Sequence, residues 1–163
     1  MSTPSSGSGL KTFTAVIAVI FGLVLLIGGI YLAVLGGSWY YIIAGLLFIA
    51  TAVLLQKLKS TALIVYALLV LGTVVWGLWE VGSDFFALAP RLDILGLFGL
   101  WLLIPAVTRG FDNVKSAKLV LTGSLAVTIA VMIFAVFNDP QEIRGELSSK
   151  QPATAQSIPG VAD

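Results

Sequence analysis

The sequence has 163 residues, of which 58% are hydrophobic and 10% are charged, and its mean hydropathy is +1.05. Average soluble domains are far less apolar, so we expect an integral membrane protein. The net charge of +1 gives no reason to expect nucleic acid as a partner, and the lack of cysteine and histidine excludes disulfides, the usual Cys/His zinc sites, haem ligation through histidine and histidine-dependent catalytic triads.

The first apolar run follows a short polar lead. Residues 1–12 are small and polar, with Lys11 as their one cation, and they predict a disordered segment. The run 13–35 comes next, and as a helix with a rise of about 1.5 Å per residue it would reach roughly 34 Å, enough to cross a hydrocarbon core of about 30 Å. It ends in Leu35 and Gly36 without the small-residue exit of a cleaved signal peptide, so we interpret it as a retained signal anchor.

Two further apolar runs follow closely. The run 39–55 opens with Trp39, Tyr40 and Tyr41, a pattern typical of the aromatic belt at a membrane interface rather than of an aromatic ligand cage. A short basic connection, 56–60, leads into the run 61–79. Because these connections are short, we expect antiparallel neighbouring helices.

The fourth run, 94–107, is the least regular. It is shorter than the usual span of about 17 to 25 residues and carries Pro105 near its end, so a re-entrant segment is the alternative to a full span. The fifth run covers 119–137. The polar segment 138–163 begins with Asn-Asp-Pro, which stops a helix, and it predicts a linker or tail.

The distribution of charge indicates the topology. With five spans, six of the nine cations share one side of the membrane and seven of the eight acids lie on the other. The first group of cations is Lys11, Lys57, Lys59, Arg109, Lys115 and Lys118, and the second is Arg91, Arg144 and Lys150. The positive-inside rule then places the amino terminus in the cytoplasm and the carboxyl terminus in the periplasm. A re-entrant fourth run would divide the basic group, so we predict an all-α, five-helix transmembrane bundle over residues 13–137.

Charged and aromatic residues are most densely mixed between the third and fourth runs. The candidate site residues there are Trp76, Trp79, Glu80, Asp84, Arg91 and Asp93. The first three are spaced i, i+3, i+4 and so share one face of a helix. One interpretation is an interfacial belt with hydrated or paired charges. The other is a pocket for a quinone, which needs an apolar slot, aromatic walls and polar groups for its two oxygens.

Three short segments carry a resemblance to a known family. They are GSWYY at 37–41, LWEVG at 78–82 and ALAPRLD at 87–93. In this order they resemble the amino-terminal membrane region of membrane-bound PQQ-dependent dehydrogenases of the glucose, quinate and shikimate type, over about residues 31–107. The resemblance implies five transmembrane helices in the bacterial inner membrane, electron transfer to ubiquinone, and a periplasmic β-propeller that holds PQQ and calcium.

No propeller residue can be carried onto this sequence, which reaches only Asp163. We therefore expect a membrane anchor and candidate ubiquinone-docking domain that is not catalytic alone, with the propeller either in the same chain or in a partner subunit. The substrate among sugars and cyclic polyols stays open. The alternative is a stand-alone membrane protein, either an anchor without a quinone role or a small transporter, although the helices lack the internal acids and bases that ion paths use.

Overall fold

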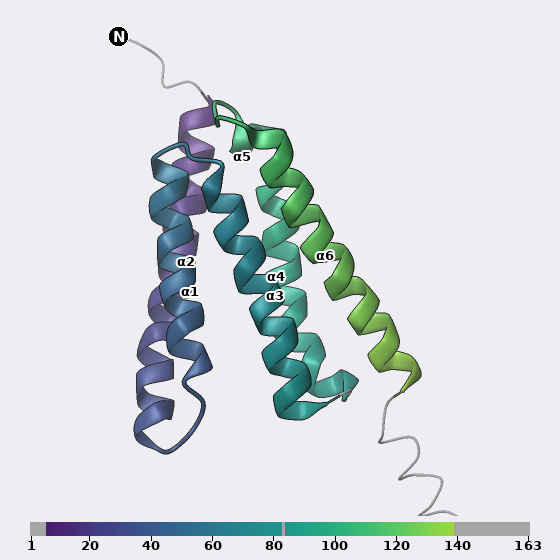
Figure 1. Ribbon diagram of the computed structural model, residues 1–163. Helices are drawn as coiled ribbons and strands as arrows, with labels where there is room; N and C mark the ends of the chain where they lie inside the picture. Colours follow the sequence, from purple (N-terminus) through teal and green to yellow (C-terminus); the bar gives the residue numbers. More distant parts are fainter. Residues whose placement is uncertain (1–5, 83, 139–163) are drawn as a thin grey trace, which may run out of the picture.

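The computed structural model describes residues 6–82 and 84–138. No strand occurs in these two ranges, so the all-α prediction is confirmed for them. The helices labelled in Figure 1 are α1 Ser6–Val34, α2 Tyr40–Gln56, α3 Thr61–Val81, α4 Phe85–Leu102, α5 Pro105–Thr108 and α6 Val114–Phe137.

Three of these helices are long and apolar enough to cross a membrane. Their apolar stretches are Gly9–Val34, Thr61–Val81 and Val114–Phe137. Helix α2 is apolar but has only 17 residues, and α4 has 18 residues and includes Arg91 and Asp93. The described chain is therefore a membrane-embedded helical protein, while the number of spans and their orientation stay predictions.

The described charges separate to the two ends of the helices (Figure 1). We call one end the basic end; it holds Lys11, Lys57, Lys59, Arg109, Lys115 and Lys118. We call the other the acidic end; it holds Glu80, Asp84, Arg91 and Asp93. At the basic end, Asp112 accepts a hydrogen bond of 3.4 Å from the backbone N–H of Ser60, which ties the α5–α6 connection to the start of α3. Each long helix thus runs from one charged end to the other.

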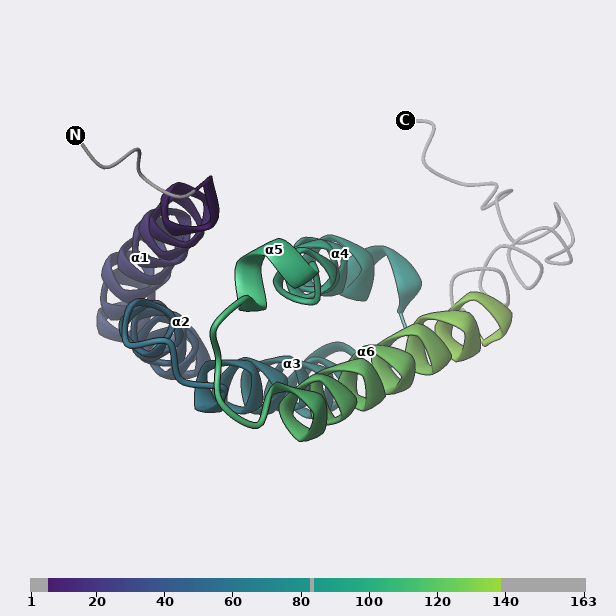
Figure 2. The same cartoon turned by 90° about the horizontal axis from the view of Figure 1, so that it is seen from above.

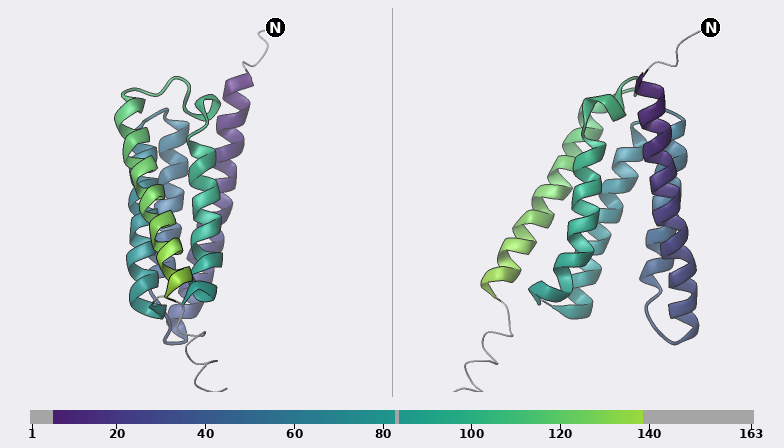
Figure 3. Two further views of the ribbon diagram at one scale, coloured as in Figure 1. Left: turned by 90° about the vertical axis from the view of Figure 1, so that its right-hand side faces the viewer. Right: turned by 180° about the vertical axis from the view of Figure 1, so that it is seen from behind.

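Helix α3 is the centre of the packing. Seen along the helices, α1, α2, α3 and α6 form a curved row, and α4 and α5 lie on its concave side (Figure 2). Helix α3 contacts α2, α4 and α6, whereas α1 packs mainly on α2 and also touches α5. The α1–α2 pair and the α3–α4 pair spread apart toward the acidic end (Figures 1 and 3).

Polar side chains inside this packing bond across helices. The hydroxyl of the fully buried Tyr66 donates to the carbonyl oxygen of Leu95 at 2.6 Å, which joins α3 to α4. The indole Nε1 of Trp101 donates to Oγ1 of the buried Thr14 at 3.0 Å, which joins α4 to α1. In hydrocarbon no water replaces a missing partner, so such bonds help to fix which helices associate.

Glycines allow α1 and α2 to approach closely. A Cβ atom built on Gly45 would lie 2.7 Å from the carbonyl oxygen of Gly22, and one built on Gly29 would lie 2.7 Å from the backbone nitrogen of Ile42. Real side chains do not fit at such distances. Because lipid is as apolar as the helix surfaces, close backbone contact of this kind is what holds neighbouring membrane helices together.

Two turns at the acidic end depend on glycine in the left-handed region. Gly36 has φ +82°, and the next residue, Gly37, donates its N–H to the carbonyl of Leu32 at 2.8 Å, which ends α1. Gly82 has φ +66° and donates its N–H to the carbonyl of Leu78 at 3.0 Å, which ends α3. Glycine adopts this conformation without the steric cost that a Cβ atom brings.

The helix bounds differ from the apolar runs in three places. Helix α1 begins at Ser6, within the predicted lead 1–12, and residues 1–5 lie outside the described ranges. Helix α6 begins at Val114 rather than at 119, because the polar turn with Lys115 and Lys118 is already helical. Apart from Asn138, the predicted tail 138–163 lies outside the described residues.

The third difference concerns the predicted fourth run, 94–107. Helix α4 begins earlier, at Phe85, because Arg91 and Asp93 interrupt the apolar pattern without interrupting the helix. It ends at Leu102, and Pro105 then starts the short α5. Ile104 has an extended conformation, with φ −59° and ψ 127°, as expected for a residue that precedes proline.

Candidate functional site

An ion pair closes the α3–α4 hairpin at the acidic end. Nη1 of Arg91 lies 2.8 Å from Oε2 of Glu80, and the two side chains are 32% and 34% exposed. Glu80 is on the last turn of α3, and Arg91 is near the start of α4. Partial exposure limits the energy of the pair. Its structural effect is to hold the two helices together and to fix the direction of the guanidinium.

Aromatic rings extend from this hairpin to the start of α2. The ring centroids of Trp76 and Trp79 are 4.9 Å apart in an edge-on arrangement, as their spacing predicts. The ring of Tyr40 stacks on Trp76 at 5.8 Å. Trp79 is 76% exposed, which suits an interfacial side chain. The indole nitrogen of Trp76 is buried, and the described residues offer it no hydrogen-bond partner.

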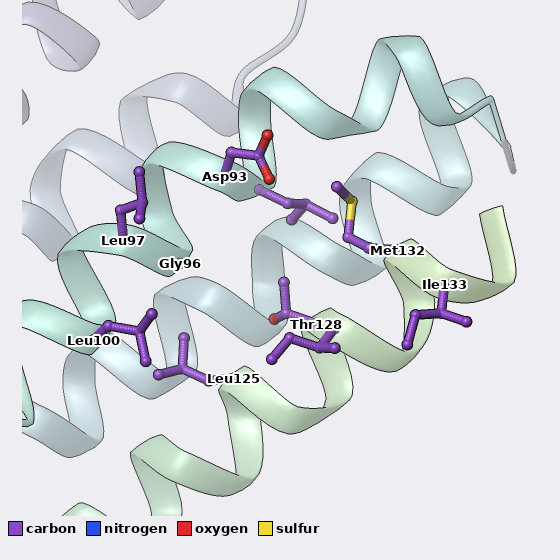
Figure 4. A pocket seen from close by; sticks show the side chains of 10 residues that line it. Asp93, Gly96, Leu97, Leu100, Leu125, Thr128, Met132 and Ile133 are labelled. Atoms are coloured by element: carbon purple, nitrogen blue, oxygen red, sulfur yellow. The ribbon is translucent and has the colours of Figure 1, made fainter. Parts of the chain in front are cut away.

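The two remaining candidates, Asp93 and Asp84, lie apart from the ion pair and the aromatic rings. Asp93 is exposed and lines a separate groove of about 260 Å³ between α4 and α6, with Gly96, Thr128 and Met132 (Figure 4). It is two residues from Arg91, so the two side chains point to different sides of α4. Asp84 is half-buried, and its carbonyl oxygen accepts the N–H of Leu88 at 3.1 Å. The six candidates therefore share one end of the molecule but not one pocket.

A cavity of about 290 Å³, which we call the four-helix cavity, lies beside the ion pair between α1, α2, α3 and α4. Its apolar walls include Phe21, Phe48 and Ile94, and its polar residues are Tyr40, Tyr41, Thr73 and Arg91. Tyr40 and Arg91 lie near the acidic ends of their helices, whereas Phe21 and Phe48 lie near mid-helix. The cavity therefore runs from the acidic end into the apolar interior.

The polar residues of the four-helix cavity are linked. The hydroxyls of Tyr40 and Thr73 form a short hydrogen bond, and Oγ1 of Thr73 also donates to the carbonyl oxygen of Leu69 at 2.8 Å. While Thr73 donates to Leu69, Tyr40 is the donor of the pair, and Thr73 can donate to Tyr40 only by giving up the bond to Leu69. Arg91 uses one of its N–H groups for Glu80, and a guanidinium has five. The cavity thus presents donors on one side and a reversible hydroxyl pair on the other.

The three segments that carry the family resemblance meet at this place. The segment 37–41 supplies Tyr40 and Tyr41, the segment 87–93 supplies Arg91, and the segment 78–82 supplies Glu80, which pairs with Arg91. Of these residues, sequence reasoning selected Glu80 and Arg91 as site candidates. It missed Tyr40 and Tyr41, which it assigned to the interfacial belt, although their place in a resembling segment was a usable signal.

Further cavity residues had no signal in the sequence. Thr73, Phe21 and Phe48 are ordinary members of apolar runs, and only the packing of four helices brings them together. We assign no residue of this chain to PQQ or calcium. Within residues 6–82 and 84–138, no group of three or more histidine, cysteine, aspartate or glutamate side chains could hold a metal ion.

Comparison with known proteins identifies the chain. No family model and no solved structure matches it. It is 60% identical over all 163 residues to quinoprotein glucose dehydrogenase A of Acinetobacter calcoaceticus, and it covers 20% of that protein. It is 49% identical over 155 residues, 94% of the chain, to quinoprotein glucose dehydrogenase of Escherichia coli strain K12, of which it covers 19%. The chain belongs to the quinoprotein glucose and quinate/shikimate dehydrogenase family.

Within this family the match has a defined extent. The chain corresponds to the amino-terminal fifth of the quinoprotein glucose dehydrogenases. It is also 37% identical over 103 residues to the glycerol dehydrogenase small subunit of Gluconobacter thailandicus, which covers 61% of this chain and 81% of that subunit. The resemblance drawn from three segments is therefore confirmed. A similar region also occurs as a separate small subunit.

Proposed function

We propose that this chain is the membrane anchor of a PQQ-dependent sugar or polyol dehydrogenase. The observation that carries the proposal is the 60% identity over all 163 residues to the amino-terminal region of a quinoprotein glucose dehydrogenase. Three helices of the length and composition of membrane spans support it. In this proposal the PQQ and calcium belong to a periplasmic propeller, which oxidises the substrate.

We further propose five spans, formed by α1, α2, α3, α4 and α6, in the bacterial inner membrane. Separation of the described charges into a basic and an acidic end supports an arrangement in which each long helix reverses the chain. The positive-inside rule then assigns the basic end to the cytoplasm and the acidic end to the periplasm. The propeller would meet the acidic end, either as a later part of the same chain or as a partner subunit. Similarity to the glycerol dehydrogenase small subunit supports the partner-subunit arrangement for some relatives.

The acidic end would also serve as the contact for ubiquinone or for the propeller. The predicted residues for this role are Trp76, Trp79, Glu80, Asp84, Arg91 and Asp93. Support comes from the Glu80–Arg91 pair beside a cavity that enters the apolar interior. It also comes from a relative, 38% identical over 112 residues, named quinate/shikimate dehydrogenase (quinone). Electrons would pass from the propeller to ubiquinone and on to the respiratory chain.

Cell fractionation tests the anchor role. The dehydrogenase that contains this chain is compared with a form that lacks residues 6–138 but keeps an export signal. We expect the complete enzyme in the membrane pellet after an alkaline carbonate wash, and the shortened form in the soluble periplasmic fraction. A shortened form that stays in the washed membrane would contradict the anchor role, since another part of the enzyme would then hold it there.

A further inference from the structure

We propose that the ring of an isoprenoid quinone binds in the four-helix cavity, with its oxygens toward Arg91 and the Tyr40–Thr73 hydroxyl pair. This inference rests on the proposed function and deepens it, because it assigns the quinone to one of several hollows at the acidic end. Of the six predicted contact residues it keeps Arg91, with Glu80 as its partner, and it adds Tyr40 and Thr73.

The size of the cavity fits a ring rather than a whole prenylated molecule. Its volume of about 290 Å³ lies at the lower limit of small-molecule sites, which measure about 300 to 1,000 Å³. Two of its wall residues, Val24 and Ile94, are 64% and 51% exposed, so the cavity opens between α1 and α4 to the lipid side. An isoprenoid tail could leave through this opening and stay in hydrocarbon.

The walls suit a flat, apolar ring. Phe21 and Phe48 stack with their ring centroids 5.9 Å apart, and both line the cavity near mid-helix. Ile94 and Leu95 lie across from them on α4. Aromatic and aliphatic walls with few polar groups are the usual surroundings of such ligands. Arg91 is the one charged side chain among the described residues that line the cavity.

Charge favours a neutral ligand over an anionic one. Arg91 is already paired with Glu80 at 2.8 Å, so a phosphate would have to compete with a carboxylate that belongs to the protein. A quinone carbonyl needs only one of the other N–H groups of the guanidinium and leaves the ion pair intact. The pair therefore holds a donor in place at the mouth of the cavity without giving it a free positive charge.

The Tyr40–Thr73 pair suits both redox forms of such a ligand. Either hydroxyl can donate in this pair, so the hydroxyl of Tyr40 can donate to a carbonyl oxygen or accept from a phenolic hydroxyl. When Tyr40 donates to a quinone carbonyl, the single proton of Thr73 turns to the Tyr40 oxygen and leaves the carbonyl of Leu69, to which it donates at 2.8 Å in this structure. A quinone presents acceptors and a quinol presents donors. The pair can therefore bond either form without an added charge.

The α4–α6 groove shown in Figure 4 is less suitable. Asp93 is the one charged residue among the described residues that line it, and a carboxylate can only accept hydrogen bonds, so it gives a quinone carbonyl no donor. The other residues on its α4 side are Leu92, Gly96, Leu97 and Leu100. Because the groove has a similar size, about 260 Å³, and shares α4 with the four-helix cavity, it provides a matched control.

Two tryptophan substitutions on α4 distinguish the two hollows. Ile94 lines the four-helix cavity and Leu97 lines the α4–α6 groove, and both are exposed, at 51% and 68%. The enzyme that contains this chain is assayed in membranes with a short-tailed ubiquinone as acceptor. We expect Ile94→Trp to raise KM for the ubiquinone about tenfold, because the indole fills the slot, and Leu97→Trp to leave it within about twofold. Tyr40→Phe should raise KM about fivefold, the effect of one neutral hydrogen bond.

Photolabelling gives a second readout that does not depend on turnover. An arylazido derivative of the short-tailed ubiquinone is expected to label peptides with Tyr40, Tyr41 or Ile94, and Ile94→Trp should remove the label. Labelling of the α6 residues Thr128 to Ile133 instead, or unchanged labelling and KM in Ile94→Trp, would overturn the assignment. Membrane retention of the enzyme is measured in every variant, so that failure of the cavity as a quinone site is distinguished from failure of the anchor.

Discussion

Arg91 has two roles that its neighbours make compatible. Its guanidinium bonds to Glu80 across the α3–α4 hairpin and also forms part of the wall of the four-helix cavity. An unpaired arginine on a membrane-embedded helix would be costly. The ion pair reduces this cost and sets the direction of the remaining N–H groups. Substitution of Glu80 should therefore weaken the ion pair alone, whereas substitution of Arg91 should weaken the ion pair and also remove a residue from the cavity wall.

Glu80→Gln and Arg91→Gln, with the double variant, measure the strength of this pair. Because both side chains are about one third exposed, we expect a coupling free energy of about 0.2 to 1 kcal/mol. The measurement is a double-mutant cycle on thermal unfolding in a fixed detergent. Additive effects of the two single substitutions would show that the ion pair does not stabilise the hairpin.

Trp101 gives a prediction about hydrogen bonds between helices. Its Nε1 donates to Thr14, and replacement by phenylalanine leaves the ring but removes this bond between α4 and α1. We expect Trp101→Phe to lower the free energy of unfolding by about 0.6 to 1.7 kcal/mol, the range for such bonds in membranes. The matched control is Trp79→Phe, which changes a side chain that is 76% exposed. Equal effects of the two substitutions would refute the assigned role of the bond.

At the scale of single residues, the sequence predicted that the candidate residues gather at one end of the molecule, but not which of them line a common cavity. The i, i+3, i+4 spacing predicted that Trp76 and Trp79 share one face of a helix, and their ring centroids lie 4.9 Å apart. It could not predict that Arg91 and Asp93 face different hollows, since this depends on where α6 packs. Thr73 was hidden for the same reason, because a threonine in an apolar run has no distinguishing pattern.

At the scale of helices, α1 and α2 behave as one hairpin held by close backbone contact. Gly22, Gly29 and Gly45 face the partner helix at distances that leave no room for a Cβ atom. Gly28, which is next to one of them in the sequence, meets nothing within 4 Å. The two kinds of position should therefore respond oppositely to the same substitution.

Gly45→Ala and Gly28→Ala test this contrast. The added methyl group on Gly45 would lie 2.7 Å from the carbonyl oxygen of Gly22 and the nitrogen of Leu26, so we expect a loss of about 1 to 3 kcal/mol in the free energy of unfolding. Gly28→Ala should be neutral or stabilising by up to about 1 kcal/mol, because alanine favours helix. Thermal unfolding in detergent measures both. A Gly45→Ala variant as stable as Gly28→Ala would contradict the close contact.

Helix bounds show where hydropathy stops being informative. Four of the five predicted apolar runs fall within one helix apart from single end residues, whereas the run 94–107 covers the end of α4, a break at 103–104 and α5. Helix α4 also extends back from this run through Asp93 and Arg91 to Phe85, where the apolar pattern is broken. Arg91 pairs there with Glu80, and a pair between α3 and α4 cannot be seen in either run alone. Pro105, by contrast, has a local effect, since proline restricts the residue before it, and α5 begins at this proline.

At the scale of the whole molecule, charge is the feature that links fold and function. The described cations, other than Arg91, gather at the basic end, and the acidic residues Glu80, Asp84 and Asp93 lie at the other. This separation supports the proposed orientation with the acidic end in the periplasm. In that proposed orientation, the four-helix cavity would lie on the side where a periplasmic domain docks.

Single cysteines test the orientation, because the chain has none of its own. Lys59→Cys lies at the basic end and Ser38→Cys lies in the turn between α1 and α2 at the acidic end. In intact spheroplasts, we expect an impermeant maleimide to label Ser38→Cys and to label Lys59→Cys only after the membrane is opened. The reverse pattern would invert the topology, and labelling of both cysteines in intact spheroplasts would be inconsistent with an odd number of spans between them.

The most direct test of the anchor role is a domain exchange. The amino-terminal fifth of Escherichia coli quinoprotein glucose dehydrogenase, to which this chain is 49% identical over 155 residues, is replaced by the present chain. We predict that the chimaera remains in the carbonate-washed membrane and passes electrons from glucose to ubiquinone. A chimaera found in the soluble fraction, although folded and active with a soluble dye, would contradict the account.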